Sequence, residues 1–292
     1  MFVVQYRKLA YILLFMIICS VIVLVPPKTE AQTEYSIEIQ GYTWDKSTIN
    51  VCVIPQENMS WWKPAYLDAA LHGIAQWNDA IQEFASNNTE YSYLSSVQFV
   101  PSVRYGNVSG FDVYMGWVAQ CSSESTIGRT QAAIEYLCVA INATVCLTAK
   151  APSGHVMTET DMQNIVVHEL GHTLGLSHCN YTSDVMYPSV YYTETVKPLS
   201  SLNLYGVSQI FGLLTTQDNQ SITCPTGTVV TLPQNMSYTQ FQIATANLPD
   251  SPMNIVEYFL QPEKLVTIAF ALILIVTTAL LFRKKKKPDK PE

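Results

Sequence analysis

The feature of this chain that most constrains its fold is a short run containing three histidines at fixed spacing. It reads His168-Glu169-Leu170-Gly171-His172-Thr173-Leu174-Gly175-Leu176-Ser177-His178. On a helix, His168 and His172 are four residues apart, so both imidazoles project from one face about one turn apart. Two ligands need this spacing to reach one zinc ion at about 2.0–2.1 Å. The run therefore predicts a helix that supplies two ligands to a metal ion.

Gly175 has a separate role in this run. A residue three positions further along a continuing helix would point away from the metal, whereas a glycine can take a positive φ and end the helix. We therefore expect the chain to turn at Gly175, so that His178 completes the ligand set. Three neutral histidines leave a fourth position for water, which is typical of a catalytic zinc. Glu169 adjoins His168 without being a ligand, and is placed to take a proton from that water as general base.

Met186 follows His178 by eight residues, in the run Ser183-Asp184-Val185-Met186-Tyr187-Pro188. After this histidine motif, it resembles the Met-turn of the metzincin clan of zinc proteases, which lies beneath the metal site. Within the clan, the residues of the histidine motif and of the Val-Met-Tyr-Pro run are most similar to those of the matrixins. Residues 199–212, which end in an aromatic-glycine pair, resemble the C-terminal helix of that family. The resemblance covers roughly residues 36–212.

This resemblance implies an α/β fold with a twisted, mostly parallel sheet and one antiparallel edge strand beside the active-site cleft. Residues 126–134 are the candidate for that strand, which would pair with an extended substrate through main-chain hydrogen bonds. The resemblance also implies one catalytic Zn²⁺, protein or peptide substrates, and the activity of a zinc metalloendopeptidase. Ca²⁺ stays open as a further ion, because Asp112 and its neighbours offer oxygen ligands but no loop has a recognisable calcium-ligand spacing.

The chain departs from the matrixin pattern at several positions. No Pro-Arg-Cys-Gly motif precedes the domain, so latency through a blocking thiolate is not expected. The acidic pair that the family usually has in its last helix is replaced by Leu202-Asn203. A second, structural zinc needs further histidines, and only His72 and His155 remain outside the motif. The sequence therefore predicts a single zinc ion.

The rest of residues 36–212 alternates strand and helix signals without an internal repeat. An apolar stripe at helical spacing predicts a helix from Pro64 to Ala85. A second helix begins near Thr158, which has capping-box spacing with Asp161. Strands are expected at 36–55 (one or two), 97–103, 111–118, 127–134 and 139–148, and a third helix at 199–211. Strands and helices in this order favour the α/β class with a mostly parallel sheet.

An apolar run near the C-terminus indicates where the protein resides. Residues 265–282 form an uncharged run of 18 residues, which as a helix covers roughly 27 Å and matches a bilayer core. The basic cluster at 283–287 marks the cytoplasmic side. We therefore expect a transmembrane helix at 265–282 and a cytoplasmic tail at 283–292. The catalytic domain, at 32–212, would then be extracellular at the cell membrane.

A second apolar run lies at the N-terminus. Residues 9–25 carry no charge and follow Arg7 and Lys8, so residues 1–31 are predicted to be a signal peptide or a signal anchor. Residues 213–262 are dominated by Thr, Gln, Asn and Pro, which predicts a juxtamembrane stalk, with a small β element around 229–232.

The segment between the two apolar runs has the composition of an exported protein. Residues 32–262 hold 6 Lys and Arg against 19 Asp and Glu, an acidic balance that argues against nucleic acid as a partner. Asn-X-Ser/Thr sequons, which predict a glycoprotein, begin at Asn58, Asn87, Asn107, Asn142, Asn180, Asn219 and Asn235.

Cysteine usage agrees with an extracellular setting. Six cysteines lie outside the first apolar run: Cys52, Cys121, Cys138, Cys146, Cys179 and Cys224. An even number favours three disulfides, whose pairing stays open. Cys179 directly follows the third predicted ligand, and a disulfide is preferred there over a thiol that blocks the metal.

These observations together predict a membrane-anchored zinc metalloendopeptidase with an extracellular catalytic domain. The predicted ligands are His168, His172 and His178, and the predicted general base is Glu169. An alternative is a catalytically inactive, zinc-stabilised binding module on the cell surface. Hydrolysis of an unfolded protein distinguishes the two.

Overall fold

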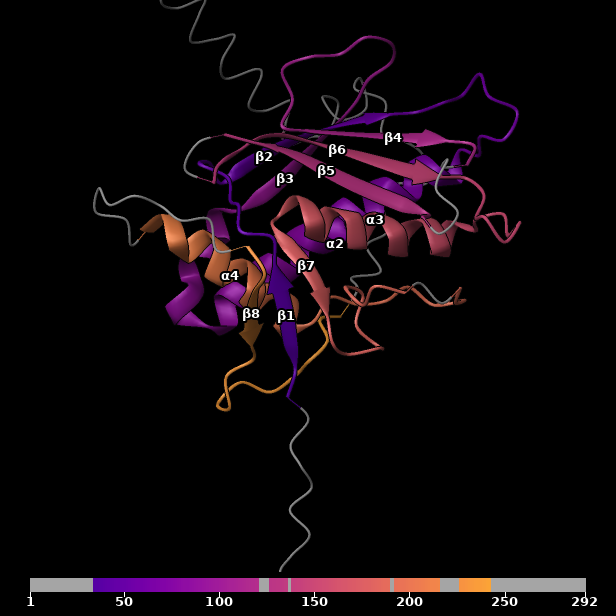
Figure 1. Cartoon of the computed structure of the whole chain (residues 1–292). Helices are drawn as coiled ribbons and strands as arrows, with labels where there is room; N and C mark the ends of the chain where they lie inside the picture. Colours follow the sequence, from indigo (N-terminus) through magenta and orange to yellow (C-terminus); the bar gives the residue numbers. More distant parts are fainter. Residues whose placement is uncertain (1–33, 121–125, 136–137, 190–191, 216–225, 243–292) are drawn as a thin grey trace, which may run out of the picture.

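The structure is a computed structural model, and it describes residues 34–120, 126–135, 138–189, 192–215 and 226–242 (Figure 1). The predicted signal segment, transmembrane helix and cytoplasmic tail all lie outside these residues. Within the described ranges, no helix combines the length and apolarity that a membrane crossing needs.

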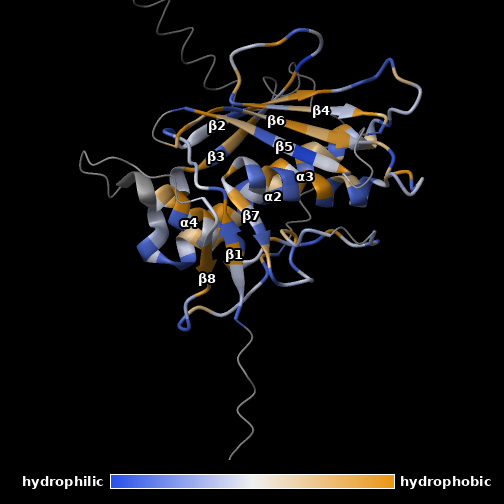
Figure 2. Ribbon diagram, in the orientation of Figure 1, coloured by the Kyte–Doolittle hydropathy of each residue, from blue (hydrophilic) through white to orange (hydrophobic). Residues whose placement is uncertain are grey.

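A five-stranded sheet forms one layer of the molecule, in the order β3-β2-β4-β6-β5. Its strands are β2 (Thr48–Ile54), β3 (Gln98–Val103), β4 (Val113–Val118), β5 (Gly128–Ile134) and β6 (Ala140–Thr148). The β2–β3, β2–β4 and β4–β6 pairs are parallel, whereas β5 runs antiparallel to β6 at the edge of the sheet. This confirms the predicted α/β class, the mostly parallel sheet and the antiparallel edge strand. β5 is also more polar than β4 and β6 (Figure 2), as suits a strand with one exposed edge.

Two long helices, α2 (Ala65–Asn87) and α3 (Glu159–Thr173), lie against one face of this sheet (Figure 1). Both form where the sequence predicts them. α2 buries an apolar stripe that includes Trp77, and the indole N–H of Trp77 donates to the Val167 carbonyl of α3 at 2.8 Å. The helices approach closely at Gly73, where a Cβ would lie 2.7 Å from a methyl carbon of Val166. This contact fixes the position of α3 beneath the sheet.

The N-terminus of α3 has the predicted capping box. The hydroxyl of Thr158 accepts from the Asp161 amide at 3.1 Å, and the Asp161 carboxylate accepts from the Thr158 amide at 3.0 Å. His155 adds a contact of 2.8 Å between its Nε2 and the same carboxylate. Because Asp161 is only 2% exposed, these hydrogen bonds replace those that its carboxylate would form with water in the unfolded chain. The start of the helix is thereby fixed nearly three turns before the first histidine of the motif.

A second, smaller sheet lies on the other side of α3 (Figure 1). It has the order β7-β1-β8, with β1 (Ser36–Ile39) paired antiparallel to both β7 (Leu176–Cys179) and β8 (Thr228–Thr231). α4 (Ser201–Thr215) packs on β1 and β7 through Gly206, where a Cβ would lie 2.8 Å from Leu176. A 3₁₀ segment, η1 (Thr89–Ser96), follows α2.

β8 belongs to the region predicted as a stalk, and this prediction needs correction for residues 226–242. The expected β element exists, but it extends the small sheet instead of standing apart from the domain. Leu232 and Phe241 are 8% and 9% exposed and join the hydrophobic core. The polar composition concealed this because only a few apolar residues in the segment make the contacts. Residues 226–242 are therefore a packed part of the domain.

The prediction of three disulfides is wrong. Cys138 is disulfide-bonded, but Cys52 and Cys179 are buried thiols, while Cys121 and Cys224 lie outside the described residues. Cys52 is on β2 and Cys179 is on β7, and both side chains are buried in the interior of the domain. Burial raises the pKa of the Cys179 thiol to about 12, so it stays protonated at neutral pH. The thiol beside the third predicted ligand is thus not part of a disulfide, and it lies outside the group of side chains arranged to hold a metal ion.

Candidate metal centre

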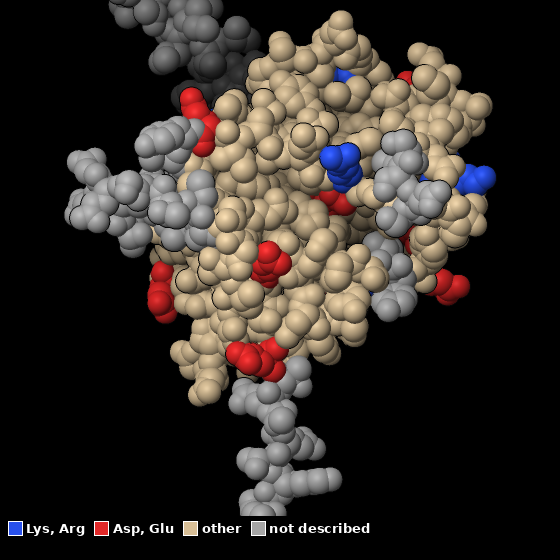
Figure 3. Space-filling view, in the orientation of Figure 1, with Lys and Arg blue, Asp and Glu red and all other residues tan. Residues whose placement is uncertain are grey.

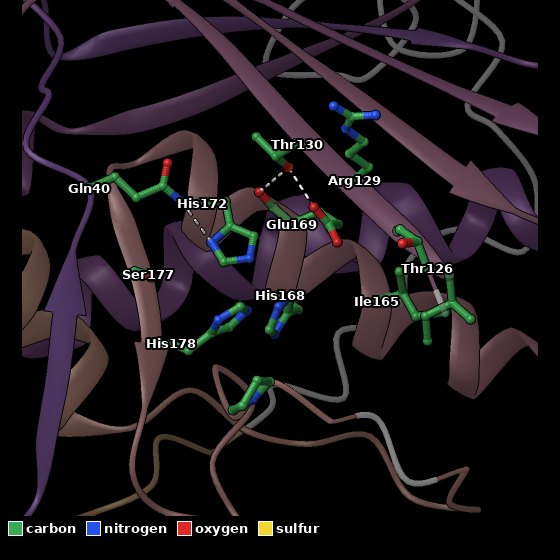
Figure 4. A pocket seen from close by; sticks show the side chains of 13 residues that line it. Gln40, Thr126, Arg129, Thr130, Ile165, His168, Glu169, His172, Ser177 and His178 are labelled. Carbon is green, nitrogen blue, oxygen red and sulfur yellow. Dashed lines mark hydrogen bonds between the residues drawn. The ribbon is translucent and has the colours of Figure 1, made fainter. Parts of the chain in front are cut away.

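The histidines of the motif meet between the two sheets. His168 and His172 project from one face of α3, and His178 reaches the same point from β7 (Figure 4). One ring nitrogen from each lies within 4.8 Å of the others. Within the described residues, no other group of three or more such side chains is arranged to hold a metal ion. The structure therefore brings the predicted ligand set together.

The turn between the two elements matches the role predicted for Gly175. α3 ends at Thr173, and Gly175 follows with a φ of +90°, a conformation that other residues rarely adopt. The chain then enters β7, whose pairing with β1 holds His178 in place. A β-carbon on Gly175 would lie only 2.5 Å from the Tyr42 carbonyl oxygen. Conformation and space thus both require glycine at this position.

Carbonyl oxygens orient the two helical ligands. Nδ1 of His168 lies 2.8 Å from the Val185 carbonyl oxygen, and Nδ1 of His172 lies 2.9 Å from that of Leu176. A carbonyl oxygen can only accept, so Nδ1 carries the proton in each ring. Nε2 then keeps the lone pair that a metal ion needs, an arrangement common among zinc-binding histidines.

The electrostatics of the site also suit a cation. Burial lowers the pKa of His168 to about 3 and that of His172 to about 4, and partial desolvation lowers the pKa of the more exposed His178 as well. All three rings are therefore neutral at physiological pH. Neutral imidazoles at this spacing fit a zinc ion with one position left for water.

Met186 lies beneath the histidines, as the Met-turn resemblance implies. It is fully buried, and its sulfur packs against Gly171, where a Cβ would overlap it. The turn is fixed by the carboxylate of Asp184, which is fully buried. That carboxylate accepts from the Met186 amide (2.8 Å), Asn203 Nδ2 (2.9 Å), Ser200 Oγ (2.5 Å) and the Tyr238 hydroxyl (3.0 Å). The carboxylate missing from the last helix is thus supplied by the turn itself, and Asn203 bonds to it.

Glu169 lies beside the three histidines and is not part of the ligand cluster. It is 4% exposed, and burial raises its pKa to about 7, an effect that a hydrogen bond from Thr130 opposes. The Thr130 hydroxyl, on β5, is 2.6 Å from Oε2 of Glu169 (Figure 4). A carboxyl group with a pKa near neutrality is suited to accept a proton and release it again.

The metal centre opens into a cleft of about 350 Å³. Figure 3 shows this hollow, with acidic atoms recessed beneath a basic side chain. The cleft is lined by Gln40, Thr126, Ile127, Gly128, Arg129, Thr130, Ile165, Ser177, Pro188, the three histidines and Glu169. β5 thus forms one wall, as expected of the edge strand.

Sequence reasoning missed several residues of this wall. Thr130 and Gly128 belong to no sequence motif. The period of two along a strand predicts only that both lie on the same face of β5. Gln40 follows β1 and lies far from the motif in sequence, yet its amide nitrogen donates to the Leu176 carbonyl at 2.9 Å and lies 3.1 Å from Nδ1 of His172. No local signal in the sequence could have found Gln40, because its contact depends on the pairing of β1 with β7.

Other candidate ligands have different partners. The Asp112 carboxylate, considered for calcium, is bonded to the Lys46 ammonium at 2.8 Å and to both the amide and the side chain of Asn50. It therefore stabilises the start of the sheet. His155 contacts Asp161, and His72 lies 4.0 Å from Glu159.

Comparison with known families agrees with this geometry. The matrixin family model matches residues 70–212, a range that includes most of α2, the five-stranded sheet except β2, the histidine motif and most of α4. No curated protein matches the chain. The matched range contains all three predicted ligands, the adjacent glutamate and the methionine turn. Residues 70–212 are therefore a matrixin-like metzincin domain, the catalytic domain of a zinc metallopeptidase family.

Proposed function

We propose that the protein is a zinc metalloendopeptidase in which His168, His172 and His178 bind the metal and Glu169 is the general base. The observation that carries this proposal is the convergence of three neutral histidines beside a buried carboxyl group with a pKa near 7. The match to the matrixins supports the same reaction class.

In this mechanism, the peptide carbonyl enters the cleft and Glu169 acts on the attacking water. Zinc, when bound, polarises the scissile carbonyl and makes the water more acidic. Glu169 holds Oε2 on Thr130 and takes the proton of the water on Oε1, while the water oxygen bonds to the carbonyl carbon. The same carboxyl group then gives the proton to the leaving nitrogen as the carbon–nitrogen bond breaks. One water is consumed, and an acid and an amine are released.

The substrates we propose are extended segments of proteins. Among the residues that the structure describes, β5 pairs with β6 alone, so its other edge has main-chain groups available for an added strand. This edge also forms a wall of the cleft. An extended peptide paired with β5 would run past the metal centre, which places a peptide bond next to Glu169.

The decisive test uses the full chain in detergent with denatured casein as substrate. We expect hydrolysis that stops with a chelator and returns with zinc. Glu169→Ala and Glu169→Gln should bind zinc as the wild type does and lose at least about 99% of turnover, because the proton acceptor is gone. Near wild-type turnover in either variant would overturn the assignment of the base. A zinc-loaded wild type without hydrolysis or hydroxamate binding would favour the binding-module alternative.

We also propose that the enzyme is held at the outer face of the cell membrane by residues 265–282. The support is the apolar run followed by the basic cluster 283–287, together with sequons on exposed asparagines such as Asn58, Asn107 and Asn235. The protein should stay in the membrane fraction after alkaline carbonate, and external protease should remove the catalytic domain from intact cells. Deletion of residues 265–292 should release it. Release of the intact chain by carbonate would contradict the anchor.

A further inference from the structure

The carboxylate of Glu169 is held by the edge strand as well as by its own helix. The Thr130 hydroxyl lies 2.6 Å from Oε2 of Glu169 and 3.0 Å from the main-chain oxygen of the same residue. A hydroxyl has one hydrogen to donate, and the shorter distance and the charge of the carboxylate favour Oε2 as its acceptor. Such a hydrogen bond is short and strong compared with one between neutral groups.

Gly128 shapes the other side of the same carboxylate. It precedes Thr130 by two positions on β5, so both residues face α3. A Cβ on Gly128 would lie 2.5 Å from Oε1 of Glu169, 2.9 Å from its carboxyl carbon and 2.8 Å from a methyl carbon of Ile165. Ile165 is one turn earlier on the helix and is 1% exposed, so it cannot move aside without disturbing the core. The carboxylate therefore fits only against a residue without a side chain.

We propose that Thr130 is a positioning residue for the general base, and that Gly128 provides the space in which it is held. This inference rests on the proposed function of Glu169. A glutamate side chain has several rotatable bonds, and a misplacement of about 1 Å in a catalytic group can cost as much as about 100-fold in rate. Two contacts from a rigid strand restrict that freedom: one holds Oε2, and the other limits where Oε1 can lie.

In this proposal β5 both holds the general base and pairs with the substrate. The inward face of β5 holds the base, and its free edge is the one proposed to pair with the substrate. Base and scissile bond are then positioned against the same backbone.

The test compares Thr130→Val, which keeps the shape and removes the hydroxyl, with Thr130→Ser, which keeps the hydroxyl. Thr48→Val is the matched control, because Thr48 is on β2 of the same sheet and its hydroxyl only accepts a 3.5 Å bond from Gln98. We expect Thr130→Val to lower kcat for casein-derived peptides by about 10- to 100-fold, with KM changed less than about threefold. Thr130→Ser should stay within about threefold of wild type, and Thr48→Val should match it.

Two measurements without turnover separate positioning from folding. Zinc content should be unchanged in Thr130→Val, because the ligands are untouched. The thermal midpoint should fall, because a buried carboxylate loses one donor, but the protein should stay folded at the assay temperature. A zinc-binding hydroxamate, which also contacts the base, should bind about 10-fold more weakly by calorimetry. Gly128→Ala tests the same idea by displacing the carboxylate: it should keep zinc and lose kcat at least as strongly.

Three outcomes would overturn the inference. These are wild-type kcat and hydroxamate affinity in Thr130→Val, loss of zinc in Thr130→Val but not in Thr48→Val, and failure of Thr130→Ser to restore kcat. Wild-type hydrolysis is measured first. Its absence would contradict the proposed function, whereas equal hydrolysis by wild type and Thr130→Val would contradict only the positioning role.

Discussion

Two separate requirements for glycine coincide at Gly175, just after α3 ends. Its φ of +90° demands a residue without a β-carbon, and so does the Tyr42 carbonyl oxygen 2.5 Å from where that carbon would be. Gly154 has nearly the same φ, +93°, but there the nearest atom to an added Cβ is the end of the flexible Lys150 side chain at 4.0 Å. The two positions therefore distinguish backbone strain from overlap.

We predict that Gly175→Ala costs clearly more stability than Gly154→Ala. The second change should cost about 1 kcal/mol from strain alone, and the first at least about 2 kcal/mol because the turn must also shift. Urea unfolding of the zinc-free proteins measures both values. Gly175→Ala should also weaken zinc binding in a chelator competition, since His178 moves with the turn. Equal costs and unchanged zinc affinity would show that the overlap with Tyr42 is relieved without moving the ligand.

At the residue scale, the motif predicted which histidines converge, because the chemistry of a metal site dictates their spacing. His168, His172 and His178 had to lie at these intervals to reach one ion, and the structure brings them together. Thr130 and Gln40 were not predictable in the same way. Each makes its contacts with residues distant in sequence, and neither a threonine in a strand nor a glutamine after one is unusual.

At the scale of elements, periodicity predicted those that fold around their own apolar pattern. The helices α2 and α3 and the strands of the large sheet lie within a few residues of their expected bounds. β7 was missed because its four residues belong to the histidine motif and form a strand only by pairing with β1. β8 was expected as an isolated element, and its partner could not be identified because β1 is nearly 200 residues earlier in the chain.

The segment that carries β8 also contacts the floor of the metal centre. The Tyr238 hydroxyl donates to the Asp184 carboxylate, and the Tyr238 ring stacks on Tyr35 with centroids 4.5 Å apart. The carbonyl of Val185, next to Asp184, orients the His168 ring. A path of two hydrogen bonds therefore joins residues 226–242 to a metal ligand. These residues lie beyond the range that the family model matches.

Tyr238→Phe should lower the free energy of unfolding by about 2 kcal/mol, because a fully buried carboxylate loses one of its donors. Tyr105→Phe is the control: its hydroxyl donates to Glu57 at 3.0 Å, but Tyr105 is 61% exposed, so water can replace the bond. That variant should cost less than about 0.5 kcal/mol. Urea unfolding at pH 7 compares the two. If both changes cost the same small amount, residues 226–242 do not support the turn.

For the molecule as a whole, the ligand set spans two structural layers. α3 packs on the large sheet, whereas β7 belongs to the small one, so a bound metal ion would connect them. Because a ligand that binds only the folded state stabilises it, zinc would hold these layers together in addition to its chemical role. The cleft lies where the layers meet, beside the free edge of β5.

The packing of residues 226–242 would set how far the proposed enzyme can act from the proposed membrane anchor. A stalk that began at residue 213 could extend roughly 175 Å before the proposed membrane segment at 265, at about 3.4 Å per residue. With 226–242 held on the domain, about 22 residues separate it from the proposed membrane segment, and a chain of that length spans at most roughly 75 Å. A short tether raises the local concentration of the enzyme for targets on its own surface. Geometry would then select membrane-bound neighbours over distant soluble proteins, whatever side chains the cleft prefers.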